Sequence, residues 1–104
     1  MQTFFSRIFP LIIIHIRGDS MSPAFHDGER VFALRFFYIF FSPAVDDVVI
    51  AADPRDGKFL IKRITAINTT GVFLSGDNPV HSTDSRSFGM IVRSALIAKV
   101  ISKI

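Results

Sequence analysis

Short apolar segments recur along the chain, and stretches rich in polar residues, glycine or proline separate most of them. Apolar segments of this length that are rich in isoleucine and valine are typical of β-strands. No long stretch has apolar residues at helical spacing, so the pattern gives little reason to expect extended helices. The strands predicted in this way cover residues 11–17, 29–35, 46–52, 58–68, 72–75, 91–92 and 96–101.

Residues that favour turns lie between the predicted strands. Turns are expected at residues 20–25 and 26–29, at the Asp-Pro-Arg-Asp-Gly segment 53–57 and at the Thr-Thr-Gly segment 69–71. Short consecutive strands joined by turns favour an all-β, mainly antiparallel fold, in the form of a small β barrel or sandwich with little helix. With 104 residues, the chain is expected to form a single domain over residues 1–104.

Residues 36–43, with the sequence FFYIFFSP, break the alternation because they are apolar on every side. A strand of this composition would overfill a small core, so we predict an exposed or membrane-dipping loop, or an extension of a hairpin. The chain has twelve phenylalanines, one tyrosine and no tryptophan, which is more aromatic surface than such a core needs. Contact with a membrane surface is therefore predicted for Phe36, Phe37, Phe40 and Phe41.

A second apolar run, residues 8–16, looks at first like a targeting segment. It is far shorter than the roughly 20 residues that span a bilayer, and it contains Pro10 and His15 with no small-residue cleavage site after it. We predict a buried strand here in preference to a signal or an anchor. The sequence thus predicts no transmembrane segment of spanning length, and a location at a membrane surface or in the cytoplasm.

Charge and cysteine content argue against several classes of function. Twelve basic and nine acidic residues give a net charge of +3, and the basic residues are scattered along the chain, so nucleic-acid binding is not expected. The chain has no cysteine, which removes disulfides, thiol nucleophiles and cysteine-based metal sites. No spacing of histidine, aspartate and glutamate fits a metal site either, so neither a metal nor another cofactor is expected.

The segment from Gly18 to Pro23, GDSMSP, directly follows the first predicted strand. Gly18 can adopt backbone conformations that other residues resist, and Pro23 prevents a regular ladder or helix from continuing. Ser20 is therefore expected on a short, stiff turn with backbone N–H groups nearby, which suits a nucleophile because such groups can bind a developing oxyanion. On its own the motif is weak, since serine beside glycine is common in ordinary turns.

Lys62 lies on the fourth predicted strand, where a period of two puts it on the same face as Leu60, Ile64 and Ala66. An amine among apolar neighbours loses hydration, its pKa falls, and the neutral form is a competent general base. Arg63 points to the opposite face, and a guanidinium does not deprotonate in proteins. The alternative is a lysine whose stem packs on apolar residues while its ammonium group reaches water.

The segment 76–89, GDNPVHSTDSRSFG, is densely polar and lies between two apolar strands. A loop of this composition needs internal hydrogen bonds to hold one conformation. Ser82 is a candidate to orient the amine of Lys62, and Asp84 is a candidate to pair with Arg86. An ordinary solvated loop is the alternative interpretation.

These segments occur together, and in the same order, in type I signal peptidases and related Ser–Lys serine endopeptidases, which the sequence resembles. The resemblance covers most of residues 16–100. The matching segments are SMSP, DVVIAADP, KRI and GDNPVHSTDSRSFG. The last of them, the polar loop, is the most specific. The resemblance implies an enzyme that cuts leader or signal peptides from precursor proteins, with Ser20 as nucleophile and Lys62 as general base. Some minimal members are dedicated maturation proteases, such as the one that processes nickel superoxide dismutase.

The same resemblance implies roles for the residues of the polar loop. Ser82 would hydrogen-bond to Lys62 and orient it, and Asp84 and Arg86 would form a structural ion pair. The residues that would shape the loop are Gly76, Asp77 and Asn78.

The resemblance also implies where the peptide substrate lies. The backbone N–H of Ser20 would bind the oxyanion, and the peptide would add as a strand beside the cleft. Some relatives have a serine hydroxyl two residues before the nucleophile; glycine stands there in this chain, so only backbone donors are expected. The residues assigned to the oxyanion site and the substrate cleft are Gly18, Asp19, Met21 and Pro23.

Other classes of function stay open at this point. Self-cleaving repressors share the Gly-Asp-Ser-Met turn but lack the polar loop. A hydrolase with a Ser–His–Asp arrangement would need His15, His26 or His81. A non-catalytic β domain that associates with membranes through its aromatic segment would tolerate changes at Ser20 and Lys62 without loss of function.

Overall fold

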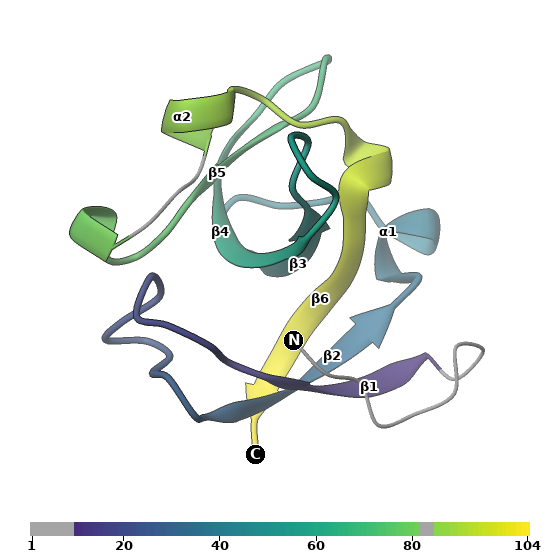
Figure 1. Ribbon diagram of the computed structural model, residues 1–104. Coiled ribbons are helices and arrows are strands. Elements are labelled where there is room, and N and C mark those ends of the chain that lie inside the picture. Colours follow the sequence, from purple (N-terminus) through teal and green to yellow (C-terminus); the bar gives the residue numbers. More distant parts are fainter. Residues whose placement is uncertain (1–9, 82–84) are drawn as a thin grey trace.

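The computed structural model describes residues 10–81 and 85–104, whose course is shown in Figure 1. Six strands form where branched and aromatic residues suit a pleated, partly buried surface. They are β1 (Leu11–His15), β2 (Arg30–Arg35), β3 (Val48–Ala52), β4 (Phe59–Ile67), β5 (Val72–Ser75) and β6 (Leu96–Lys103). Short helical segments lie between some of them, namely α1 (Phe37–Phe40), η1 (Pro79–His81), α2 (Ser85–Phe88) and η2 (Arg93–Ala95).

All six strands belong to one sheet in the order β1-β2-β6-β3-β4-β5, and every neighbouring pair is antiparallel. The last strand, β6, drawn in yellow in Figure 1, therefore lies inside the sheet between β2 and β3. None of the helices in the described part of the chain is long and apolar enough to cross a membrane. The prediction of an all-β, mainly antiparallel fold with little helix is confirmed.

Two clusters of buried apolar side chains hold the sheet together. Alternate residues of β3 point into different clusters, so this strand is buried on both faces, and each large apolar side chain buried in this way contributes roughly 1.5–3 kcal/mol. The first cluster comprises Ile12, Ile14, Ile16, Met21, Val31, Ala33, Val48, Ile50, Ile61, Ala98 and Val100. The second comprises Val49, Ala51, Ile64, Val72, Leu74, Ile91 and Leu96.

The pairing of β4 with its two neighbouring strands determines which of its residues are buried. This strand pairs with β3 on one side and with β5 on the other, where Arg63 lies opposite Ser75. The register with β5 shifts between Ile64 and Ala66, so Ala66 is exposed although Ile64 is fully buried. The predicted alternation therefore holds from Lys62 to Ile64 and ends at this irregularity.

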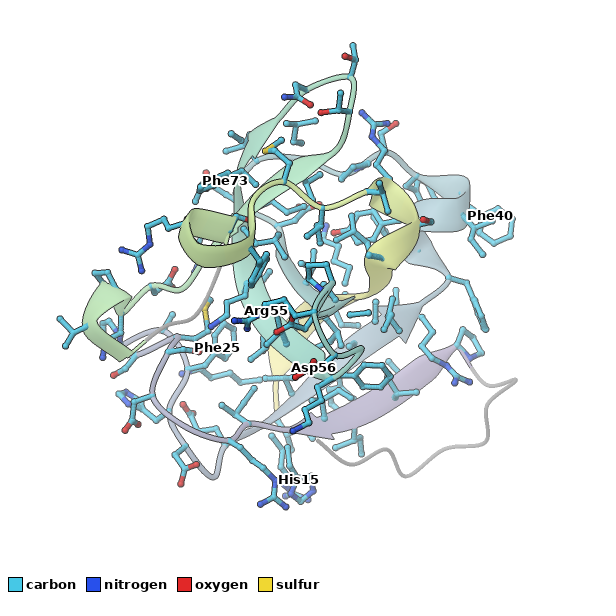
Figure 2. All side chains as sticks on the ribbon, turned by 45° about the horizontal axis from the view of Figure 1, so that its top comes forward. His15, Phe25, Phe40, Arg55, Asp56 and Phe73 are labelled. Carbon is cyan, nitrogen blue, oxygen red and sulfur yellow. The ribbon has the colours of Figure 1, made fainter. Side chains whose placement is uncertain are left out.

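An ion pair holds the turn between β3 and β4. The buried Asp53 carboxylate accepts hydrogen bonds from Arg55, at 3.0 Å from Nε and 2.7 Å from Nη2. These bonds keep the pKa of the Asp53 carboxyl below its usual value. The Arg55 guanidinium also lies 5.2 Å from the centre of the Phe88 ring, which connects this turn to α2; Figure 2 labels Arg55 and its neighbour Asp56.

The prediction of a loop at residues 36–43 is wrong in part, because the helical turn α1 forms within this segment. Phe36 has a positive φ of 67°, which reverses the chain after β2, and no glycine or proline interrupts the helical turn that follows. The predicted exposure is confirmed for Phe36, Phe40 and Phe41. Phe37 is only half-exposed and stacks on Phe41, with the ring centres 4.8 Å apart. In Figure 2, Phe40 projects away from the body of the protein.

The region after β5 also differs from its prediction. The described part of residues 76–89 contains the short helical segments η1 and α2 in place of an unbroken loop. The strand predicted at residues 91–92 is reduced to a single β-bridge between Ile91 and Val72. After η2 the chain enters β6, which continues to Lys103 because it pairs with β2 to that point.

Candidate active site

Ser20 lies on the turn that follows β1. Gly18 has a positive φ of 81°, a conformation that suits glycine, and its N–H donates a 2.7 Å hydrogen bond to Asp27 Oδ1. Directly after the serine, Met21 packs its side chain into the first core cluster and is 1% exposed. The backbone is thus held on both sides of Ser20, while Asp19 lies on the exposed surface of the turn.

A backbone contact joins this turn to the polar loop after β5. The N–H of Asn78 donates a 2.8 Å hydrogen bond to the carbonyl oxygen of Ser20. Pro23 follows on the exposed side of the turn, after a cis peptide bond with Ser22. The turn at residue 20 and the loop at residue 78, which are nearly 60 residues apart in the sequence, therefore meet at the candidate nucleophile.

Lys62 has a side chain that is only 3% exposed. Its neighbour Ile61 packs in the first core cluster, and Ile64, on the same face as the lysine, packs in the second. Lysine is seldom buried to this degree, because removing an ammonium group from water costs free energy. The structure thus buries Lys62 on β4, between residues that belong to the two core clusters.

A pocket of about 240 Å³ brings Ser20 and Lys62 together. The strand supplies an apolar wall with one amine, and the turn supplies one hydroxyl. A hydroxyl and a buried amine that line one pocket are the groups from which a nucleophile and its general base can be made. The residues that line the pocket are Arg17, Ser20, Phe59, Leu60, Ile61 and Lys62. Met21, which the sequence assigns to the substrate cleft, has its side chain in the core.

Arg63 holds the polar loop in place, a role that the sequence analysis misses. Its guanidinium makes two parallel hydrogen bonds to the Asp77 carboxylate, at 2.9 Å from Nε to Oδ1 and 2.8 Å from Nη2 to Oδ2. These bonds raise the pKa of the Arg63 guanidinium. A third hydrogen bond of 3.1 Å runs from Nη1 to the carbonyl oxygen of Asp46. Because Asn78 follows Asp77, this bidentate pair fixes the residue that contacts the Ser20 turn.

Alternation across the two strands contains a signal for this pair. Arg63 lies opposite Ser75, and residue 77 would face the same side as residue 75 if the strand geometry continued. An arginine and an aspartate are thereby brought to one side of the β4–β5 pair. The expected role of Asp77 in shaping the loop thereby gains a specific partner, Arg63.

The other predicted loop residues have different outcomes. Arg86 donates a 3.2 Å hydrogen bond from Nη2 to a carbonyl oxygen of η1. Ser82 and Asp84 lie outside the described residues, so their roles stay predictions. Ser85 was not singled out, although its buried hydroxyl accepts a 2.8 Å hydrogen bond from the N–H of Leu74 and so connects α2 to β5.

We expect Arg63→Gln to loosen the loop that contacts Ser20. The substitution removes a charge-assisted pair worth about 1–3 kcal/mol, so the melting temperature should fall by several degrees, and the Asn78 amide should exchange faster with solvent. Thermal unfolding and amide hydrogen exchange measure the two effects. Arg30→Gln, at an exposed position on β2, is the matched control. Unchanged exchange at Asn78 would show that the ion pair does not hold the loop.

The positions of the histidines support a Ser–His–Asp arrangement less well than the pocket at Ser20 supports a Ser–Lys pair. His26 is exposed, with Nδ1 3.2 Å from the hydroxyl of Ser22. His15 lines a separate pocket of about 200 Å³. The side chain of His81 lies outside the described part of the structure. Among the residues that the structure describes, those lining the pocket at Ser20 include a lysine and no histidine.

Comparison with known proteins identifies a group of relatives. The model of the family described as "Signal peptidase, peptidase S26" matches residues 1–71, a range that includes Ser20 and Lys62. Mitochondrial inner membrane protease subunit 1 from Schizosaccharomyces pombe is 32% identical over 108 aligned residues, which cover 84% of this chain and 69% of the relative. The proteins of the same name from Mus musculus and Homo sapiens are 29% and 30% identical, and both alignments cover 88% of this chain and 68% of the relative.

Proposed function

The chain belongs to the signal peptidase family, peptidase S26, and from this premise we propose that it is a serine endopeptidase that cuts leader or signal peptides from precursor proteins. Ser20 is the nucleophile of the proposed reaction, and Lys62 is its general base. The observation that supports this assignment most directly is the pocket of about 240 Å³ that both residues line. The relatives are named as subunits of a mitochondrial inner membrane protease, and their chemistry is peptide hydrolysis.

The proposed mechanism uses the amine of Lys62 in its neutral form, which burial favours. The amine accepts the proton of the Ser20 hydroxyl as Oγ attacks the carbonyl carbon of the peptide bond. The C–N bond then breaks, the Lys62 ammonium group gives its proton to the leaving amine, and an acyl-enzyme ester remains. Water attacks the ester with Lys62 again as base, and the leaving Ser20 oxygen takes back the proton.

The backbone N–H of Ser20 is the proposed donor to the oxyanion. Within the described residues, no acceptor takes this N–H, whereas the N–H of Gly18 is already bonded to Asp27. The carbonyl of Ser20 is held by Asn78, which fixes the orientation of the peptide units around the serine. A donor held in this way stabilises developing charge without reorganising during the reaction.

Membrane contact belongs to the same proposal. Phe40 and Phe41 are 77% and 61% exposed, Phe36 is also exposed, and Phe37 supports them by stacking from a half-buried position. Aromatic side chains beside basic ones suit the interface of an anionic membrane. An enzyme held at this surface would meet precursor proteins or leader peptides that are themselves bound to the membrane. Dedicated maturation of a single precursor, such as that of nickel superoxide dismutase, is a narrower form of the same function.

Peptide cleavage by the purified chain in the presence of phosphatidylglycerol vesicles tests the proposal. The substrates are secretory precursors and a short soluble leader peptide, and the products are identified by mass spectrometry. We expect cleavage after a small residue, with the rate lowered at least about 10³-fold by Ser20→Ala and unchanged by Ser102→Ala, at an exposed position on β6.

The other outcomes of this assay are equally informative. Cleavage that survives Ser20→Ala would contradict the assignment of the nucleophile. A folded protein that binds the vesicles and cleaves none of the substrates would favour a non-catalytic membrane-associating domain. The range of substrates cleaved would separate a general signal peptidase from a dedicated maturation protease.

A further inference from the structure

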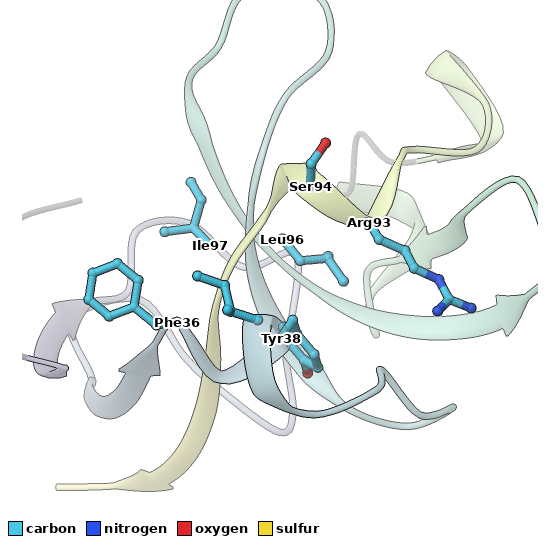
Figure 3. A pocket seen from close by; sticks show the side chains of 7 residues that line it. Phe36, Tyr38, Arg93, Ser94, Leu96 and Ile97 are labelled. Carbon is cyan, nitrogen blue, oxygen red and sulfur yellow. The ribbon is translucent and has the colours of Figure 1, made fainter.

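A second pocket, larger than the one at Ser20, lies between α1 and the start of β6 and has a volume of about 460 Å³. This volume falls in the range of roughly 300–1,000 Å³ that is usual for sites of small ligands. Figure 3 shows the pocket from close by. Its lining includes neither Ser20 nor Lys62 and consists of Phe36, Tyr38, Ile39, Arg93, Ser94, Leu96 and Ile97.

The lining of this pocket is apolar along most of its length and cationic at one end. In Figure 3, Phe36 and Arg93 lie on opposite sides of the view, with Leu96 and Tyr38 between them. The Tyr38 hydroxyl already donates a 2.8 Å hydrogen bond to Asp47, so it adds little free polarity to the pocket. Burial of the ring, together with this hydrogen bond, raises the pKa of Tyr38.

Arg93 is the charged group of the pocket. It is exposed, and none of the residues that the structure describes forms an ion pair with it. Ser94 also lines the pocket, but in Figure 3 its hydroxyl points away from the Arg93 guanidinium. A guanidinium at one side of a mainly apolar pocket is suited to a phosphate group that is attached to a hydrocarbon chain.

The surface around the pocket is also apolar and bordered by a cation. Ile39, which lines the pocket, and the next residue, Phe40, are 73% and 77% exposed. The Arg35 guanidinium lies 5.2 Å from the centre of the Phe36 ring, so a second cation borders this apolar surface. Hydrocarbon and anionic head groups are both complementary to such a surface.

We propose that this pocket binds one acyl chain of an anionic phospholipid, with the phosphate at Arg93 and the hydrocarbon chain directed toward Phe36. In the proposed arrangement the exposed side chains of Ile39 and Phe40 contact the bilayer, while Arg93 stays at the level of the head groups. The inference adds a specific lipid site to the proposed membrane contact. It does not depend on which residues cleave the peptide, and its test involves no cleavage assay.

Tyr38 provides a reporter inside the pocket, because it is the single tyrosine of a chain without tryptophan. We would titrate the full chain with dodecyl phosphate below its micelle concentration and follow tyrosine fluorescence, with dodecyl maltoside as the uncharged comparison. We expect saturable binding of dodecyl phosphate, weakened about 5–30-fold by Arg93→Gln, because a hydrogen-bonded charge pair contributes about 1–2 kcal/mol. Arg30→Gln, which removes the same charge elsewhere, should leave the affinity unchanged.

Two further variants separate the pocket from the surrounding surface. Ser94→Phe, at an exposed position, should fill the pocket and remove dodecyl phosphate binding. Phe40→Ser should weaken binding to vesicles of phosphatidylglycerol and phosphatidylcholine but leave dodecyl phosphate binding intact. No saturable response to dodecyl phosphate, or equal losses in Arg93→Gln and Arg30→Gln, would overturn the proposal. The proposal would also be overturned if vesicle binding depended on Phe40 but were unaffected by Ser94→Phe.

Discussion

Lys62→Met is expected to abolish peptide cleavage while leaving the protein folded. The lysine is 3% exposed on β4, and removing its amine from water costs free energy. Methionine has a similar length and no amine, so it can fill the same space. Loss of the general base should lower kcat/KM at least about 10³-fold on the precursor peptide.

Lys62→Arg separates the proton-transfer role of the lysine from its charge. Arginine keeps the positive charge but does not lose a proton in proteins, so this variant should be as inactive as Lys62→Met. Its larger head group in a buried site should also lower the melting temperature, and for this reason the methionine variant decides between loss of chemistry and loss of folding. Cleavage near the wild-type rate by either variant would contradict the assignment of Lys62.

Gly71→Ala is expected to cause a large loss of stability, greater than alanine at Gly18, Gly28, Gly57 or Gly89. A Cβ atom at Gly71 would lie 2.0 Å from the carbonyl oxygen of Ile91, a backbone atom that cannot move without breaking its 2.8 Å hydrogen bond from the Val72 N–H. Val72 and Ile91 both belong to the second core cluster, so their packing would be disturbed as well. We expect a loss of about 2–3 kcal/mol and a fall in melting temperature of roughly 10–20 °C.

Gly57→Ala is the control for this effect. Gly57 also has a positive φ, of 76°, but a Cβ atom there would have no heavy atom within 4 Å. This variant therefore measures the cost of the backbone conformation without a clash, about 1–2 kcal/mol. If Gly71→Ala proved no more destabilising than Gly57→Ala in thermal unfolding, the close packing of residue 91 on the β4–β5 turn would be contradicted.

The strands and turns could be predicted from the sequence, because apolar and polar residues alternate along the strands and turn-favouring residues separate them. The burial of Lys62 follows from its place on a strand of period two, and the turn at Ser20 follows from Gly18 ending an apolar strand. Both are local properties of the chain. For the same reason the strands were found to within a few residues, since branched residues and turn residues alternate clearly along this sequence.

Features that depend on contacts between distant segments could not be predicted in the same way. The pairing of Arg63 with Asp77 requires the register of β4 against β5, and the close approach at Gly71 requires the bridge between Val72 and Ile91. The helical turn α1 was missed because a run that is apolar on all sides has no periodicity to read. Its burial pattern arises only when it packs beside β6.

The most direct test of a Ser20–Lys62 pair is the cleavage rate of the double variant, Ser20→Ala with Lys62→Met, beside the two single variants. Residues that act as one catalytic unit show strongly non-additive losses. The account predicts that the double variant cleaves the precursor peptide at the same residual rate as Ser20→Ala alone. The alternative is that the two losses multiply: the double variant is then slower than Ser20→Ala by the same factor that Lys62→Met costs in the wild type. That result would contradict a shared step and with it the proposed mechanism.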